Sequence, residues 1–218
     1  MKKQILSIAS IALVAGALVM SGCKKDDITS PTITLVGDNE VTITLGTAYT
    51  DAGATANDDR DGDLTTKVTV DASAVKVDKA GVYLVTYSVT DEAGNAGSAE
   101  RTVVVKIINS SLAGTYNATE TCSPPPSPTP YTITVNAAGG DQVTVSLVDF
   151  GKFANPLTVN AILSGQTGLT FTIPSQTVGA VLFAGSGSVQ DDGKKITYNY
   201  TATDANGTQT CKATLIKQ

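Results

Sequence analysis

The chain has 218 residues, a formal net charge of −5 and a charged fraction of only 16%. It contains no histidine, which excludes Ser-His-Asp triads, histidine-bound metals and the commonest general base. An acidic surface repels phosphate backbones, so no nucleic acid partner is expected. Threonine, valine, alanine and glycine are abundant without the charge excess of a disordered chain. The composition therefore predicts a folded, β-rich protein without a catalytic site.

The N-terminus has the layout of a secretory signal peptide. Lys2 and Lys3 precede an apolar run over residues 5–20, which is too short for a comfortable membrane span. The run ends in Met20-Ser21-Gly22-Cys23, so residues 1–22 are the expected signal peptide. Their removal would leave 196 residues and, without the two lysines, a net charge of −7. An ordinary signal peptide with a chance cysteine is the alternative.

Met20-Ser21-Gly22-Cys23 resembles the lipobox of bacterial lipoproteins, with Met in place of the usual Leu. The resemblance implies that Cys23 is acylated and becomes the first mature residue. Several acyl chains would hold the protein firmly in a membrane. The following Lys24-Lys25-Asp26-Asp27 is similar to the export signal of Bacteroidota surface lipoproteins, which implies display on the extracellular side of the outer membrane. A merely solvated tether over residues 23–31 is the alternative.

Residues 32–108 show the pattern of short strands separated by turns. Over residues 81–90, Tyr83, Val85, Tyr87 and Val89 alternate with Leu84 and polar side chains, as in a half-buried strand. A hairpin is expected over residues 91–95 and a returning strand over 99–108. Earlier candidate strands cover residues 33–35, 41–45, 52–56 and 67–70. About seven short strands predict a β-sandwich.

Several segments of this region, residues 31–37, 49–56, 59–65, 81–83 and 85–95, resemble the bacterial Ig-like modules of surface lipoproteins. The region lacks the cysteine pair and tryptophan of antibody domains. The resemblance implies a spacer or adhesion module, not an enzyme.

Asn109-Ser110-Ser111 is the predicted boundary of a second domain, residues 109–218. Asp191-Asp192-Gly193 and Asp204-Ala205-Asn206-Gly207 are hairpin signals that flank a strongly alternating strand. Consecutive hairpins predict a meander that closes into an antiparallel barrel without free edges. Nine candidate strands cover residues 115–122, 131–136, 143–148, 157–163, 169–173, 178–183, 185–190, 195–203 and 208–216.

Gly114-Thr115-Tyr116 resembles the Gly-x-Trp opening of lipocalin-like barrels, with Tyr in place of Trp. Residues 113–122, 173–177 and 185–187 are similar to the lipocalin-like domains of Bacteroidota lipoproteins. The expected fold is therefore all-β, with an Ig-like β-sandwich followed by an antiparallel, lipocalin-like meander barrel.

Cys122 and Cys211 are predicted to form a disulfide. Cys122 ends the first predicted barrel strand, and Cys211 lies in the first half of the last one. In a closed meander with an even strand number these two strands are antiparallel neighbours, so the cysteines meet near the same rim. An exported protein enters an oxidising compartment that favours the bond. Two free thiols are the alternative.

The acidic segment over residues 58–63 is a candidate metal site. It fails as an EF-hand, because a loop starting at Asp59 places Leu64 and Val70 where glycine and glutamate are needed. Asp59, Asp61 and Asp63 remain candidates for calcium between Ig-like loops, with help from Asp51 or Asp91. Turns in which each carboxylate binds nearby backbone N–H groups are the alternative.

Glycan binding needs an exposed aromatic platform, yet tryptophan is absent and aromatic residues make up 5% of the chain. Phe150 and Phe153 are the candidates for an exposed, ligand-binding pair, unless they plug the barrel end. Four tyrosines are expected in the core, namely Tyr83, Tyr87, Tyr198 and Tyr200.

The expected function is non-enzymatic binding of a small apolar ligand, a glycan or an extracellular protein, with the lipid anchor as the membrane contact. The alternative is a purely structural or adhesive component of the cell envelope. The barrel interior discriminates between them, because a ligand pocket needs an open cavity of at least ~300 Å³.

Overall fold

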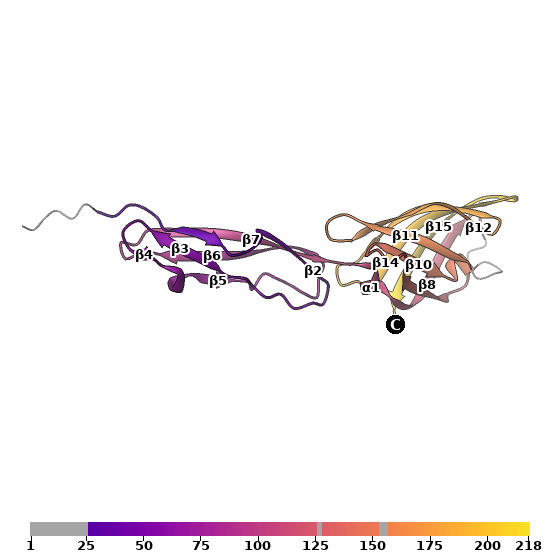
Figure 1. Cartoon of the computed structure of the whole chain (residues 1–218). Helices are drawn as coiled ribbons and strands as arrows, with labels where there is room; N and C mark the ends of the chain where they lie inside the picture. Colours follow the sequence, from indigo (N-terminus) through magenta and orange to yellow (C-terminus); the bar gives the residue numbers. More distant parts are fainter. Residues whose placement is uncertain (1–25, 126–127, 153–156) are drawn as a thin grey trace, which may run out of the picture.

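The computed structural model describes residues 26–125, 128–152 and 157–218. Within these residues the regular secondary structure is almost entirely β-strand, as predicted. The exceptions are one turn of helix, α1 (Asn109–Leu112), and two 3₁₀ turns, η1 (Thr65–Lys67) and η2 (Phe150–Lys152). Figure 1 shows two packed sheets at one end and a closed barrel at the other. No helix in the described part of the chain has the length and apolar character needed to cross a membrane.

The first domain contains two sheets. β1, β3 and β4 form an antiparallel three-stranded sheet, and the second sheet has the order β2-β7-β6-β5, with β2 parallel to β7. The seven strands are β1 (Thr32–Leu35), β2 (Glu40–Thr44), β3 (Ala54–Asp58), β4 (Gly62–Asp63), β5 (Thr69–Asp71), β6 (Gly81–Thr90) and β7 (Ala96–Lys106).

Strand β6 shows why this region folds as a sandwich. Val85, Tyr87 and Val89 are buried on its inner face, whereas the side chains between them are exposed. Burial of each such side chain contributes roughly 1.5–3 kcal/mol, which sets the register of the strand. The predicted alternation is confirmed, except that Tyr83 is only half-buried near the end of the sheet.

The sandwich core contains a buried arginine, Arg101 of β7, with 1% of its side chain exposed. Its guanidinium contacts Asp51 Oδ2 at 3.0 Å and donates to the carbonyl oxygens of Asp38 and Val36. It also lies 5.5 Å above the ring centre of Tyr87. Val36 and Asp38 follow β1, Asp51 lies between β2 and β3, and Tyr87 belongs to β6. Arg101 therefore ties the loops on either side of β2 to the four-stranded sheet.

The second domain is a closed eight-stranded antiparallel meander, in which β15 pairs with β8 to complete the barrel. Closure leaves no free edge, as predicted. The strands are β8 (Gly114–Ser123), β9 (Tyr131–Ala137), β10 (Thr144–Val148), β11 (Thr158–Ser164), β12 (Thr170–Val178), β13 (Val181–Val189), β14 (Lys195–Asp204) and β15 (Gly207–Lys217).

The prediction of nine barrel strands is wrong at one place. The segment 178–183 is not a strand, because the chain reverses at Gly179 and Ala180, with Val178 paired to Val181. Gly179 has a φ of +64°, which glycine adopts without strain. Upstream, β12 runs through Pro174 as a β-bulge between Ile173 and Gln176, so the missing proline N–H breaks no ladder bond.

Two glycines of β13 make room for aromatic rings. Gly185 is paired with Tyr200 and Gly187 with Tyr198 across the ladder to β14. A Cβ atom at Gly185 would lie 2.8 Å from Cβ of Tyr200, and one at Gly187 would lie 2.6 Å from Cβ of Tyr198. The Gly-Ser-Gly sequence is therefore a packing requirement of the barrel wall.

The two domains meet in a continuous apolar contact. Ile107 and Ala80 are buried in the same cluster as the barrel interior, and Leu45 packs against it. Backbone N–H groups of Ala80 and Ile107 donate to Asp191 O (2.7 Å) and Thr167 O (2.9 Å). At the start of α1, the Asn109 side chain donates to three carbonyl oxygens of the β9–β10 hairpin, at 2.6–3.3 Å.

Candidate functional site

The first candidate site is the barrel interior, which contains Phe150. Phe150 is fully buried, so the prediction that it forms an exposed pair with Phe153 is wrong for this residue. Its ring centre lies 4.6 Å from that of Tyr200, 5.4 Å from Phe183 and 5.6 Å from Tyr198. Burying the ring among these partners removes more apolar surface from water than exposing it at the rim. Phe153 lies outside the described residues.

Among the described residues, side chains from all eight strands pack in the barrel interior. Tyr198 and Tyr200 are buried, as predicted, and so is Tyr116 near the first domain, where its hydroxyl donates to Leu112 O at 2.7 Å. An eight-stranded barrel is just wide enough for its own side chains to fill it. The described interior is thus a packed apolar core, which is continuous with Ala80 and Ile107 of the first domain.

One carboxyl group lies inside this apolar core. Glu120 of β8 is 9% exposed, and the Tyr131 hydroxyl donates to its Oε2 at 3.2 Å. Its Oε1 and the hydroxyl of Tyr198 have no hydrogen-bond partner among the described residues. Burial raises the pKa of Glu120, and the hydrogen bond from Tyr131 opposes this shift only in part.

The raised pKa of Glu120 makes barrel stability depend on pH. The unfolded chain ionises near the ordinary value of 4.5, whereas the folded barrel holds the proton to higher pH. The stabilisation is therefore fully present below pH 4.5 and is lost as the pH rises through the folded pKa. Replacing Glu120 by glutamine keeps a neutral side chain of the same shape. We expect the E120Q barrel to melt at a higher temperature than the wild type at pH 7, with a smaller decline between pH 4.5 and 8.

Circular dichroism melting curves of the two proteins over this pH range check the prediction. Glu92→Gln is the matched control, since Glu92 is exposed and should leave the pH profile unchanged. Parallel profiles for wild type and E120Q would contradict a protonated Glu120.

Cys122 and Cys211 form the predicted disulfide beside Glu120. The two cysteines are directly paired across β8 and β15, with a Cα–Cα distance of 4.1 Å. A Glu120 oxygen and the two sulfurs lie within 4.8 Å of one another. Because the sulfurs are bonded to each other, neither offers the thiolate that a metal would require.

The acidic loop of the first domain is built from carboxylate-capped turns. Asp58 Oδ1 accepts hydrogen bonds from the N–H groups of Arg60 (2.9 Å) and Asp61 (3.0 Å), and Asp63 Oδ1 accepts one from Thr65 (2.8 Å). Asp61 Oδ2 accepts one from Glu92 N at 2.7 Å, which ties the loop to the β6–β7 hairpin. The turn alternative is confirmed for Asp58 and Asp63, whereas the bond to Asp61 comes from a distant segment.

The structure does not bring Asp59, Asp61 and Asp63 together as a ligand set. In the described residues, the three acidic side chains whose oxygens do meet within 4.8 Å are Asp27, Asp58 and Asp91. Sequence reasoning missed Asp27, because it lies in the expected tether, 31 residues before Asp58 and 64 residues before Asp91. Only the packing of three distant segments reveals this cluster.

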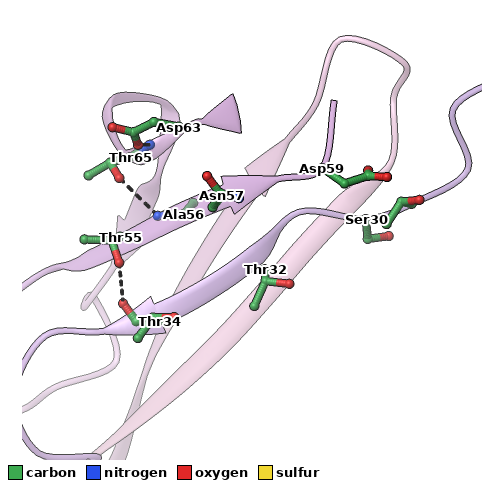
Figure 2. A pocket seen from close by; sticks show the side chains of 10 residues that line it. Ser30, Thr32, Thr34, Thr55, Ala56, Asn57, Asp59, Asp63 and Thr65 are labelled. Atoms are coloured by element: carbon green, nitrogen blue, oxygen red, sulfur yellow. Dashed lines mark hydrogen bonds between the residues drawn. The ribbon is translucent and has the colours of Figure 1, made fainter. Parts of the chain in front are cut away.

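A polar groove follows the exposed face of the three-stranded sheet (Figure 2). Its volume is about 700 Å³, and threonine side chains of β1 and β3 line it, with Thr34 paired to Thr55 across the ladder. Asn57, Asp59 and Asp63 add amide and carboxylate groups. The lining contains no aromatic ring, so the groove suits hydroxyl-rich or polar contacts and not apolar ligands.

Comparison with known proteins supports the assignment of the first domain. Residues 33–105 match the family model of the bacterial surface protein Ig-like domain. No curated protein matches the chain in sequence.

Among solved structures, the chain is similar to a lipoprotein from Bacteroides thetaiotaomicron, with 20% identity and a TM-score of 0.38, covering 86% of this chain and 100% of that one. A Bacteroides ovatus protein of unknown function shows 11% identity and a TM-score of 0.34 over 87% of this chain and 95% of that one. A redesigned β-barrel shows 16% identity and a TM-score of 0.35 over 52% of this chain and 96% of that one. Such low scores carry no functional argument. The family match and the two-sheet fold agree on an Ig-like domain of the bacterial surface protein type over residues 33–105.

Proposed function

We propose that this protein is a non-enzymatic lipoprotein of the outer membrane that serves as a structural or adhesive component of the cell surface. In this proposal Cys23 carries the lipid anchor, the Ig-like domain is the spacer, and the barrel is the part presented outward. The observation that carries the proposal is the close packing of the described side chains inside the barrel.

The filled interior favours this role over transport or storage of a small apolar ligand. A pocket for such a ligand occupies about 300–1,000 Å³ and is lined mainly by apolar side chains. Here Phe150, Phe183 and Tyr198 occupy the corresponding space with their own rings. Binding of a glycan or a protein would then use outer surfaces such as the polar groove of the sandwich.

The contacts between the domains support the spacer role. Ile107 and Ala80 connect the sandwich to the barrel core, and the Gln166 side chain donates to Glu40 Oε1 at 3.3 Å. A spacer that holds its cargo at a fixed orientation requires such apolar and hydrogen-bonded contacts, which a flexible linker lacks. The match of residues 33–105 to a surface-protein family supports the proposed location.

The anchor is tested by replacing Cys23 with serine. Without a thiol to acylate, the protein should leave the membrane fraction or remain uncleaved, because a polar, unlipidated N-terminus has no affinity for the bilayer. Ser21→Ala, which keeps a small residue before the cysteine, is the matched control and should fractionate like the wild type. Membrane retention of a C23S protein that has lost its signal peptide would contradict the anchor.

Surface display is tested separately with a protease that cannot enter intact cells. We expect the wild-type protein to be digested on whole cells, while a periplasmic marker stays intact. Resistance on intact cells, together with digestion after lysis, would place the protein on the inner face of the membrane and contradict surface display.

A further inference from the structure

Three acidic side chains converge at the end of the sandwich where the chain enters it. Asp27 comes from the segment before β1, Asp58 from the end of β3 and Asp91 from the hairpin between β6 and β7. One carboxylate oxygen of each lies within 4.8 Å of one from each of the others. Asp58 and Asp91 are buried, with exposures of 3% and 7%. Like charges so close and so shielded from water repel one another unless a cation lies among them.

Asp58 provides independent evidence for a ligand at this cluster. Its Oδ1 is satisfied by the two backbone N–H groups of its own turn, as described above. Its Oδ2 is buried and has no hydrogen-bond partner among the described residues. A buried carboxylate oxygen without a partner is costly, and natural proteins satisfy such atoms with a donor, a water or an ion. Asp58 Oδ2 is therefore the oxygen of this carboxylate that is available to bind an ion.

The neighbouring groups hold the other two carboxylates in place. Asn95 donates its backbone N–H to Asp91 Oδ1 and its side-chain N–H to Asp91 Oδ2, both at 2.7 Å. The same Asn95 amide nitrogen lies 3.2 Å from the backbone carbonyl oxygen of Asp27, which fixes the entering segment to the hairpin. Arg60 Nε lies 3.8 Å from Asp27 Oδ2 with a side chain 34% exposed. Among the described residues, this partly exposed guanidinium is the one cationic group paired with the three carboxylates.

We propose that Asp27, Asp58 and Asp91 form a calcium-binding site. The donors are all hard oxygen atoms, which calcium prefers. Two ligands that each lie about 2.4 Å from one ion are at most about 4.8 Å apart, so the observed spacing admits calcium. Magnesium needs shorter bonds of about 2.0–2.1 Å in a stricter octahedron, so we expect this site to bind magnesium more weakly than calcium. Water molecules complete the coordination shell.

The site joins three segments that are distant in sequence. A bound ion would hold Asp27, four residues after Cys23, against the ends of β3 and the β6–β7 hairpin. Calcium therefore stiffens the point at which the sandwich leaves its tether. The site itself does not depend on the proposed function, because it would bind calcium whether or not Cys23 is acylated.

Isothermal titration of the detergent-purified full chain, after chelator treatment, tests the proposal with calcium chloride as the probe. We expect one site per chain with a Kd of about 10⁻⁴–10⁻³ M, as in extracellular calcium modules. Saturating calcium should also raise the melting temperature, because it binds the native state. Asp27→Asn and Asp58→Asn should each weaken binding by about tenfold or more, since calcium affinity follows the number of charged ligands.

Asp59→Asn and Asp63→Asn are the matched controls, because both residues lie in the same loop region but outside the cluster. They should bind calcium like the wild type. Asp58→Asn could impair folding, because Asp58 is a buried residue of a turn. Asp27→Asn tests the same site without this risk, since Asp27 precedes the first strand. A native circular dichroism spectrum confirms the fold of each variant. No titratable binding by the wild type up to 5 mM calcium would overturn the proposal. So would loss of binding in the controls with retention in Asp27→Asn, which would place the ion in the acidic loop.

Discussion

Replacing both Cys122 and Cys211 with alanine is expected to lower the free energy of unfolding of the barrel by about 4–5 kcal/mol, because the disulfide closes a long loop. The two cysteines are 89 residues apart in the sequence. In the oxidised protein the bond lowers the conformational entropy of the unfolded chain, so folding costs less entropy. The effect is comparable to the whole stability of a small domain. The bond joins the first and last strands, so its loss acts on the seam that closes the barrel.

Urea unfolding followed by circular dichroism measures this loss for the transition assigned to the barrel. Wild-type protein in excess reductant is the matched control and should unfold like the double variant. Mass spectrometry after alkylation without reduction should find no alkyl group on Cys122 or Cys211. Labelling of both, or a stability change below about 1 kcal/mol, would contradict the role of the disulfide.

Arg101→Leu is expected to destabilise the Ig-like domain by about 3–5 kcal/mol, because removing one partner of a buried ion pair leaves the other charge uncompensated. Asp51 would stay in the sandwich, with 19% of its side chain exposed, and would lose the Arg101 contact at 3.0 Å. The carbonyl oxygens of Val36 and Asp38 would also lose their donor. The unfolding transition of the first domain in urea, at pH 7, is the measurement.

The double variant Arg101→Leu/Asp51→Leu is the control, because replacing a buried ion pair by apolar residues often restores stability. It should recover part of the loss, and equal stability of single and double variants would argue against the ion pair.

The dependence of unfolding on acid pH gives a second test. Burial raises the pKa of Asp51, but hydrogen bonds from Tyr49, Tyr87 and the Gly53 amide, with the charge of Arg101, hold it below its ordinary value. The wild type should therefore lose this stabilisation as the pH falls through the folded pKa, and R101L should lose less.

The alternation of apolar and polar residues in the sequence predicted many of the strands. The period-two pattern of residues 81–90 coincides with β6, because a strand with one buried face must alternate. The pairing of Cys122 with Cys211 followed from strand count and closure, since the ends of a closed even meander are neighbours. The turn chemistry of Asp58 and Asp63 was also readable, because each carboxylate binds N–H groups only two or three residues away.

Tertiary packing decided the rest. Phe150 lies in a segment that the sequence predicts as an exposed loop, but its ring packs inside the barrel against Phe183, Tyr198 and Tyr200. The barrel interior could be judged filled or open only once these side chains were placed together.

The charged groups likewise show features that the sequence does not predict. Arg101 reads as an ordinary polar residue of an alternating strand, yet the packing of two sheets buries it against Asp51. Asp27, Asp58 and Asp91 converge because the entering segment, β3 and a hairpin end at one corner of the sandwich. Sequence alone determined which residues alternate, turn and pair locally. Contacts between segments far apart in the chain depend on how whole sheets pack, and only the tertiary structure contains that information.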